Sequence, residues 1–332
     1  MQTRSLGQQG LKVSSIGLGT MGMTMAYGPS NENEAIATIR RAYELGVNFF
    51  DTAELYGYGN GHNEQLLGKA VKDFRDKVVL ATKFGFDMTA EQIGTRFNSR
   101  PENIRKVAEN SLRYLQTDYI DVFYQHIPDP DVPIEEVAGV VGDLIKEGKV
   151  KYFGLSNTGS NTIRKAHAVT PVSMLQTEYS IFEREIEDNN IRKTLNELGI
   201  GLVPYAPLGR GFLTGAVKPA QEYAEGDMRR YDERWQGENY IYNLRATEQL
   251  NELASNKGIS VAELALAWLL AQGEDIVPIP GTRSAKRVEQ NVAAANVKLT
   301  EVELQRIKEI LPHGSAGSRY PAGMLENFTR DS

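Results

Sequence analysis

The chain has 332 residues, of which 41% are hydrophobic and 24% charged, an ordinary composition for a folded protein with one large domain. Its net charge of -6 gives no electrostatic reason to expect a nucleic acid partner, and the absence of cysteine excludes disulfides, thiolate catalysis and Cys-ligated metals. We expect a cytoplasmic protein that does not enter membranes, because neither a signal peptide nor a membrane-spanning stretch is visible.

Short apolar runs alternate with longer segments of helical period. Residues 3–15 predict a β-hairpin, with Gly7 and Gly10 at the two ends of its turn. Strands are then expected at 15–19, 48–51, 78–83, 119–125, 150–156, 174–178, 201–205 and 276–280. Helices are expected between them, among others at 32–45, 63–71, 101–115, 134–147 and 162–168. Eight such units predict parallel strands in a single-domain α/β fold, a (β/α)8 TIM barrel spanning residues 1–332.

Two connections are longer than a barrel requires. They cover residues 84–100 and 213 to about 244, and the second is rich in aromatic residues, namely Tyr223, Tyr231, Trp235, Tyr240 and Tyr242. Because long loops in a compact domain are usually functional, we expect the second one to form a lid. The tail segment 314–324 is also expected to fold over the barrel mouth.

Gly17, Gly19 and Gly22 spell GLGTMG directly after the first expected strand, which matches the glycine fingerprint of dinucleotide-binding folds. That fingerprint requires its third glycine to open a helix that receives the pyrophosphate. Here the sequence continues MTMAYGPSNENE, so a helix is expected only from about residue 31. We therefore interpret these glycines as a tight turn at the barrel mouth.

Titratable side chains follow three consecutive expected strands. Asp51, Lys83 and His126 stand at the ends of the second, third and fourth strands, and Tyr56 follows Asp51 by five residues. Each alone has an ordinary explanation, as a helix cap, a surface lysine, a packed tyrosine or a loop histidine. Because the carboxyl ends of barrel strands meet at one mouth, their coincidence favours a shared active site.

These four side chains are suited to carbonyl reduction. Tyr56 is the expected general acid, and the ammonium of Lys83 is expected to lower its pKa from the usual value of about 10. Asp51 is expected to hold Lys83, and His126 to orient the carbonyl oxygen by a hydrogen bond.

Several ordered motifs resemble those of the aldo-keto reductases. The four residues lie in DTAELYG, ATKFG and YQHIPDP, and they resemble the catalytic constellation of that superfamily in order and spacing. GLSN, QTEYS, YAPLGRGFLTG and IPGTRSAKRVEQN, further along the chain, resemble its cofactor segments. The resemblance runs from about residue 3 to about residue 310 and is nearest to the bacterial and plant branch related to potassium-channel β subunits and pyridoxal reductases. It implies an NADP(H)-dependent oxidoreductase of the alcohol dehydrogenase or aldehyde reductase type.

The resemblance also implies a set of cofactor contacts. Polar side chains at adjacent strand ends would bind the nicotinamide carboxamide, Tyr205 would stack on its ring, and a glycine-rich loop would wrap the pyrophosphate. The full set is Gly19, Thr20, Met21, Asp51, Ser156, Asn157, Gln176, Tyr205, Pro207, Leu208, Gly209, Arg210, Gly211, Leu213, Ile279, Gly281, Thr282, Arg283, Arg287, Gln290 and Asn291.

Basic residues open the helix expected after the last strand. Arg283, Lys286 and Arg287 oppose the helix macrodipole there, which makes sense if an anion occupies the same end. The 2′-phosphate of NADP is the expected anion, with Arg287 as its main partner. Gly281 and Gln290 depart from the lysine and glutamate of many family members, and Arg283 could substitute for the missing lysine.

The substrate is expected to be an apolar or aromatic carbonyl compound. Its pocket is expected to include Met21, Met23, Tyr27, Tyr56, Phe84 and His126. No metal site is expected, because only one of the four histidines lies at a strand end. A redox-sensing NADP-binding module of the channel β-subunit type and a phosphate-binding isomerase on the same barrel stay open as alternatives. A monomer and a homo-oligomer are both compatible with the sequence.

Overall fold

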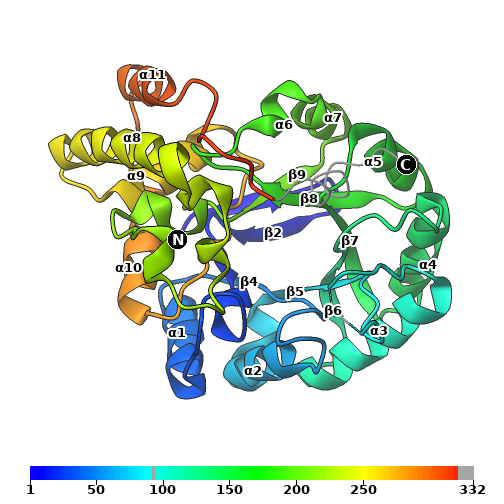
Figure 1. Ribbon diagram of the computed structural model, residues 1–332. Coiled ribbons are helices and arrows are strands. Elements are labelled where there is room, and N and C mark those ends of the chain that lie inside the picture. Colours follow the sequence, from blue (N-terminus) through cyan, green and yellow to red (C-terminus); the bar gives the residue numbers. More distant parts are fainter. Residues whose placement is uncertain (92–93, 321–332) are drawn as a thin grey trace.

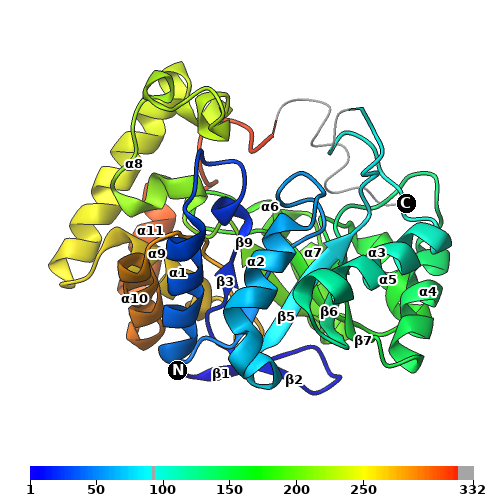
Figure 2. The same ribbon diagram turned by 90° about the horizontal axis from the view of Figure 1, so that it is seen from below.

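The computed structural model describes residues 1–91 and 94–320. Strands form the wall of a nearly closed barrel, and helices surround it (Figure 1). A two-stranded hairpin, β1 (Thr3–Leu6) and β2 (Leu11–Ser14), lies at one end, while the long loops and the tail gather at the other (Figure 2). Gly7 and Gly10 have φ of 74° and 89°, a conformation in which glycine is favoured, so the predicted hairpin and its turn are confirmed.

The barrel strands pair in chain order, and all are parallel. They are β3 (Leu18–Gly19), β4 (Phe49–Asp51), β5 (Val79–Phe84), β6 (Ile120–Gln125), β7 (Val150–Ser156), β8 (Val172–Glu178) and β9 (Gly201–Tyr205). The predicted barrel fold is therefore confirmed for seven of its eight strands.

The segment expected as the eighth strand, residues 276–280, closes the barrel without forming a regular strand. Isolated parallel bridges join Ile276 to Leu202 on one side and Gly281 to Gly19 on the other. The segment contains two prolines, which carry no N–H, so it cannot donate a full ladder of hydrogen bonds to its neighbours. The sequence predicted the position of this segment correctly, but the prediction of a regular strand was wrong.

The five helices named from the sequence form within two residues of their expected ends. Helix α1 begins where the side chain of Asn31 accepts hydrogen bonds from the backbone of Asn33 and Glu34, a normal N-cap. The helices are α1 (Glu32–Glu44), α2 (His62–Val71), α3 (Pro101–Leu115), α4 (Ile134–Lys146), α5 (Ser160–Val169), α6 (Glu185–Asp188), α7 (Ile191–Leu198), α8 (Gly237–Asn256), α9 (Val261–Ala271), α10 (Ala285–Ala293) and α11 (Glu301–Ile310). Among the described residues, no helix has both the length and the apolar character needed to cross a membrane.

The hairpin closes the end of the barrel that lies opposite the long loops. Leu6, Leu11 and Val13 pack with inward-facing residues of the barrel strands, including Tyr124 and Met174, in one buried cluster. Because apolar side chains fill that end, polar groups pointing into the barrel can reach solvent or a ligand only at the opposite mouth.

The second long loop is shorter and more buried than the sequence predicts. Helix α8 begins at Gly237, so the lid covers residues 213–236 rather than reaching 244. Trp235 and Tyr223 are 2% and 9% exposed and belong to the main hydrophobic core, whereas Tyr231 is 64% exposed. Some of these aromatic residues thus pack in the core. Aromatic content alone therefore predicted a lid that extends too far along the chain.

Candidate active site

Lys83 lies at the centre of the polar groups in the barrel mouth. Its ammonium donates hydrogen bonds to Asp51 Oδ1 at 2.6 Å, to the Thr52 carbonyl oxygen at 2.7 Å and to Tyr56 Oη at 3.2 Å. These three groups come from β4 and the loop that follows it, whereas Lys83 lies on β5. The structure therefore brings three of the four expected catalytic side chains into direct contact.

Burial dominates the protonation of this cluster. It raises the pKa of Asp51 and lowers the pKa of Lys83, and the contact between the two opposes both shifts. Burial, followed by the nearby Asp51 carboxylate, raises the pKa of Tyr56 well above 10, so the expected lowering by Lys83 is wrong. Because its pKa is raised, the Tyr56 phenol is fully protonated near neutral pH.

His126 faces Tyr56 across the mouth. Their rings meet edge-on with centroids 6.0 Å apart, and Phe86 packs edge-on against the same imidazole at 5.0 Å. Burial and then the Lys83 charge lower the pKa of His126 well below 6.5. The imidazole is therefore neutral at physiological pH, with one N–H available as a hydrogen-bond donor.

A second row of polar groups lines the ends of β7, β8 and β9. Gln176 Nε2 donates to Asp51 Oδ2 at 2.7 Å, which links this row to Lys83. Asn157 Nδ2 donates to Ser156 Oγ at 3.0 Å, and the Tyr205 hydroxyl donates to Asn157 Oδ1 at 2.9 Å. The residues expected to bind a nicotinamide are thus neighbours, next to the expected catalytic groups.

The glycine loop (residues 207–213) is a tight turn closed by its own backbone hydrogen bonds. Gly209 and Gly211 have φ of 55° and 106°, a conformation that favours glycine, and their N–H groups donate to the carbonyl oxygens of Ala206 and Leu208 at 2.9 and 3.0 Å. Leu208 is only partly buried, whereas Pro207 and Leu213 are buried and shape the loop from within.

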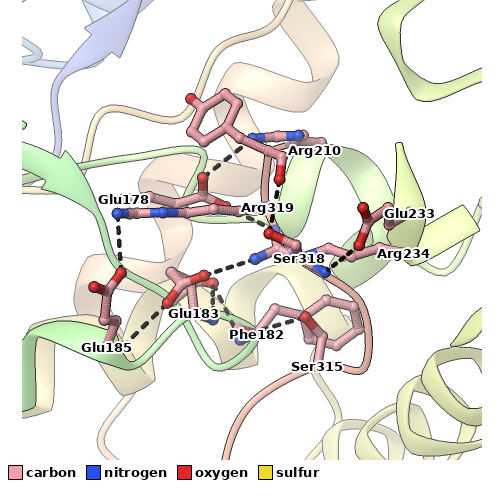
Figure 3. A network of polar contacts seen from close by, with 12 residues as sticks. Glu178, Phe182, Glu183, Glu185, Arg210, Glu233, Arg234, Ser315, Ser318 and Arg319 are labelled. Atoms are coloured by element: carbon pink, nitrogen blue, oxygen red, sulfur yellow. Dashed lines mark hydrogen bonds and ion pairs between the residues drawn. The ribbon is translucent and has the colours of Figure 1, made fainter. Parts of the chain in front are cut away.

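Arg210, in the same loop, is buried rather than exposed. Its guanidinium lies 2.5 Å from Asp232 Oδ2 and 3.2 Å from Glu178 Oε2, so two carboxylates neutralise its charge. The resemblance implies a cofactor contact for Arg210, and in the structure its side chain binds the lid and the end of β8 (Figure 3).

The basic residues near α10 divide into two roles. Arg283 donates to the carbonyl oxygens of Tyr27, Gly28 and Pro29 at 3.2, 3.3 and 2.6 Å. It therefore fastens the loop before α1 and is not a free replacement for the missing lysine. Arg287, by contrast, is exposed in the first turn of α10.

The remaining expected cofactor residues surround the junction between β3 and the closing segment 276–281. Gly19 and Gly281 pair there, with Ile279 buried beside them. Thr282 is half-buried and Gln290 exposed, whereas Asn291 is buried.

The fingerprint glycines lead into a short 3-10 turn, Met21–Met23, and the next helix begins only at Glu32. The GLGTMG motif therefore does not open a helix, as predicted. Thr20 Oγ1 donates to the Asp51 carbonyl oxygen at 2.8 Å and to Asn63 Oδ1 at 2.6 Å. Asn63 was not expected, and its place in the first turn of α2 gives no signal that it anchors this turn.

One expected substrate contact is misplaced. Phe84 packs against Phe123 at 4.6 Å within the outer core, because successive strand residues face opposite sides and Lys83 faces inward. Phe86, two residues on, is the aromatic residue beside His126. Met21 and Tyr27 are half-buried near the mouth, and Met23 is buried.

Comparison with known protein families finds a match over nearly the whole chain. A model of the Aldo/keto reductase family matches residues 15–312. The chain belongs to this family. The resemblance inferred from the catalytic and cofactor motifs is thereby confirmed.

Related aldo/keto reductases cover the chain almost completely. A probable aldo-keto reductase of Glycine max is 43% identical over 332 residues, spanning 99% of this chain and 94% of that protein. An aldo-keto reductase of Schizosaccharomyces pombe, whose name includes NADP(+), is 41% identical over 99% of this chain and 97% of its own length. Among solved structures, the glycerol dehydrogenase of Gluconobacter oxydans superposes with a TM-score of 0.85 at 29% identity, over 96% of this chain and 98% of that one.

Two further carboxyl groups, those of Glu54 and Glu64, lie near each other in this aldo/keto reductase. Glu64, on α2, accepts a hydrogen bond from Thr82 Oγ1 at 2.7 Å and faces the Lys83 charge. Glu54 Oε2 is buried and has no hydrogen-bond partner among the described residues. Burial and the nearby Glu64 carboxylate raise the pKa of Glu54 to about 8.

Replacing Glu54 with glutamine should flatten the pH dependence of stability. A folded carboxyl with a pKa of about 8 holds a proton that the unfolded carboxyl, with a pKa of 4.5, releases. The stability contributed by this proton is complete below the lower value and is lost as pH rises towards 8, by at most about 1.4 kcal/mol per pH unit. Urea unfolding at several pH values would test this, with Glu136→Gln on the exposed face of α4 as control. An identical pH dependence in wild type and Glu54→Gln would refute the raised pKa.

Proposed function

We propose that this aldo/keto reductase reduces aldehydes or ketones to alcohols with NADPH, using Tyr56 as the general acid. The observation that carries the proposal is the contact of one buried ammonium, Lys83, with both Asp51 and the Tyr56 phenol. A neutral imidazole faces that phenol from the other side of the mouth. A proton donor, a cation and a second hydrogen-bond donor thus converge where a carbonyl oxygen would be reduced.

Each of the four side chains has a distinct task in this mechanism. His126 donates its N–H to the carbonyl oxygen and orients it. Tyr56 transfers its proton to that oxygen, and Lys83 stabilises the phenolate left behind. Asp51 holds the ammonium in place through the 2.6 Å contact. A reduced nicotinamide, when bound, supplies hydride to the carbonyl carbon.

The residues present fit such a cofactor. Amide and hydroxyl groups at the ends of β7 and β8 suit a carboxamide, and the lack of side chains at Gly209 and Gly211 allows a pyrophosphate to approach the loop closely. Lys286 and Arg287, both exposed in the first turn of α10, suit a 2′-phosphate. The NADP(+) in the name of the Schizosaccharomyces pombe relative supports the same choice of cofactor.

The proposal is tested by following nicotinamide absorbance with NADPH, and then NADH, against a panel of aromatic and aliphatic aldehydes, ketones and dicarbonyls. We expect oxidation of the cofactor with at least one carbonyl class, and faster turnover with NADPH. Tight NADPH binding without turnover on the whole panel would instead support a redox-sensing module. Failure to bind either cofactor would refute the proposal.

A further inference from the structure

A second tyrosine, Tyr124, lies inside the barrel beside Lys83. It is on β6, paired in register with Lys83 of β5, and its side chain is fully buried. The Lys83 ammonium lies 5.9 Å from the centre of the Tyr124 ring and 4.8 Å from the centre of the Tyr56 ring. The ammonium is therefore within reach of two phenol rings, and the proposed mechanism uses only one of them.

The barrel makes room for the Tyr124 ring by omitting a side chain on the next strand. Gly154 of β7 pairs with Tyr124, and a Cβ atom at residue 154 would lie 2.3 Å from the ring. That separation is far inside van der Waals contact, so a residue other than glycine would displace the ring. Tyr124 thus has one fixed place on the inner face of the barrel wall.

The hydroxyl of Tyr124 is not explained by packing. It is buried and has no hydrogen-bond partner among the described residues. A buried hydroxyl without a partner destabilises a folded protein, and phenylalanine would fill the same space without that penalty. Such a group in the middle of an active site therefore points to a partner that it acquires in another state of the enzyme.

The polar groups that this hydroxyl faces are Asp51 and Gln176. Burial, followed by the Asp51 carboxylate, raises the pKa of Tyr124 well above 10, and the Gln176 side chain opposes that shift. Asp51 accepts from Lys83 through Oδ1 and from Gln176 through Oδ2. A carboxylate offers about four acceptor positions, and Asp51 is 2% exposed, so water does not fill the others. A donor without a partner thus faces an acceptor that has room for one.

The ion pair of Asp51 and Lys83 has to stay charged for the proposed reduction. Burial raises the pKa of Asp51 and lowers the pKa of Lys83, so burial favours transfer of the proton from Lys83 to Asp51 and loss of both charges. A neutral amine does not stabilise the phenolate that Tyr56 leaves behind. Every hydrogen bond donated to the Asp51 carboxylate opposes this neutralisation.

Gln176 serves two partners in the proposed function. It donates to Asp51 Oδ2 in this structure and is expected to bind the nicotinamide carboxamide. We propose that Tyr124 is a positioning residue for carbonyl reduction, whose hydroxyl donates to Asp51 Oδ2 when Gln176 turns to the carboxamide. Asp51 then keeps two donors, and Lys83 keeps its charge and its place. This inference rests on the proposed function, and Tyr124 acts through Asp51 and Lys83 rather than on the substrate.

The test compares wild type with Tyr124→Phe. We expect the variant to bind NADPH and NADH equally weakly relative to wild type, by about tenfold, the usual effect of one hydrogen bond to a charged group. The kcat for the carbonyl compound that wild type reduces fastest should fall by a similar factor. Without cofactor, the melting temperature should equal or exceed that of wild type, since the hydroxyl has no partner there. Quenching of protein fluorescence measures both affinities and needs no turnover.

Tyr152→Phe is the matched control. Tyr152 is a half-buried tyrosine that packs against the same cluster as Tyr124, two residues before Gly154 on β7. Its substitution should leave both affinities and kcat unchanged. A lower melting temperature of cofactor-free Tyr124→Phe with wild-type affinities and kcat would show a purely structural role and overturn the inference.

The path through Asp51 is tested by repeating the substitution in Asp51→Asn, whose amide has no charge to hold. In that background Tyr124→Phe should change NADPH affinity by less than about twofold, because the two residues act as one unit. A tenfold loss in both backgrounds would overturn the inference. A wild type that binds NADPH but reduces no carbonyl compound contradicts the proposed function itself, whereas an active Tyr124→Phe with wild-type affinities contradicts only the role of Tyr124.

Discussion

Replacing Tyr56 with phenylalanine should lower kcat for carbonyl reduction by about 10²- to 10⁴-fold, the usual contribution of a positioned general acid. The substitution removes one oxygen and leaves the ring, so packing in the mouth changes little. Lys83 keeps its contacts with Asp51 and with the Thr52 carbonyl oxygen, at 2.6 and 2.7 Å. NADPH affinity should therefore stay close to that of wild type. Steady-state kinetics together with a fluorescence titration of NADPH measure both quantities.

The matched control is Tyr119→Phe, which removes a hydroxyl from a half-buried tyrosine just before β6, at the end of the barrel opposite to the mouth. Turnover of that variant should equal that of wild type. Near-normal turnover of Tyr56→Phe would mean that another group protonates the alkoxide. His126 is poorly suited to that task, because its lowered pKa keeps it neutral and a neutral imidazole is a weak acid.

The barrel and the arrangement of the site were predictable because both depend on local patterns. Alternating apolar and helical segments define the strands, and the carboxyl ends of parallel strands always meet at one mouth. Asp51, Lys83 and His126 could therefore be placed together without knowledge of the structure. The closing segment 276–280 was predicted in place, but its two prolines prevent a regular ladder.

Features that depend on distant contacts were missed. Nothing local distinguishes Trp235, a core residue, from an aromatic residue on a lid. The tail was expected over the mouth for residues 314–324, which holds for residues 314–320, and residues 321–324 lie outside the described residues. What the sequence did not reveal are the partners of this segment, since the partner of the Tyr320 hydroxyl is 115 residues away. The pKa of Tyr56 was predicted in the wrong direction, because the sequence names the neighbouring ammonium but not the degree of burial.

Replacing Arg287 with alanine should weaken NADPH binding by about 10- to 100-fold and NADH binding by less than about twofold. A charge-assisted hydrogen bond to phosphate contributes about 1.5–3 kcal/mol, and each 1.4 kcal/mol corresponds to a tenfold change. Arg287 is exposed in the first turn of α10, where a bound anion would relieve its unfavourable interaction with the helix dipole. Fluorescence titrations with both cofactors measure the two affinities.

Arg306→Ala, on the exposed side of α11, is the control for loss of one surface charge. Equal losses for NADPH and NADH in Arg287→Ala would contradict a role in phosphate recognition. Arg283→Ala should behave differently, because its guanidinium holds three consecutive backbone carbonyls of residues 27–29. Loss of that contact loosens a loop beside the site, so both cofactors should weaken together. Only Arg287 should discriminate between them, which separates recognition of the phosphate from maintenance of the loop.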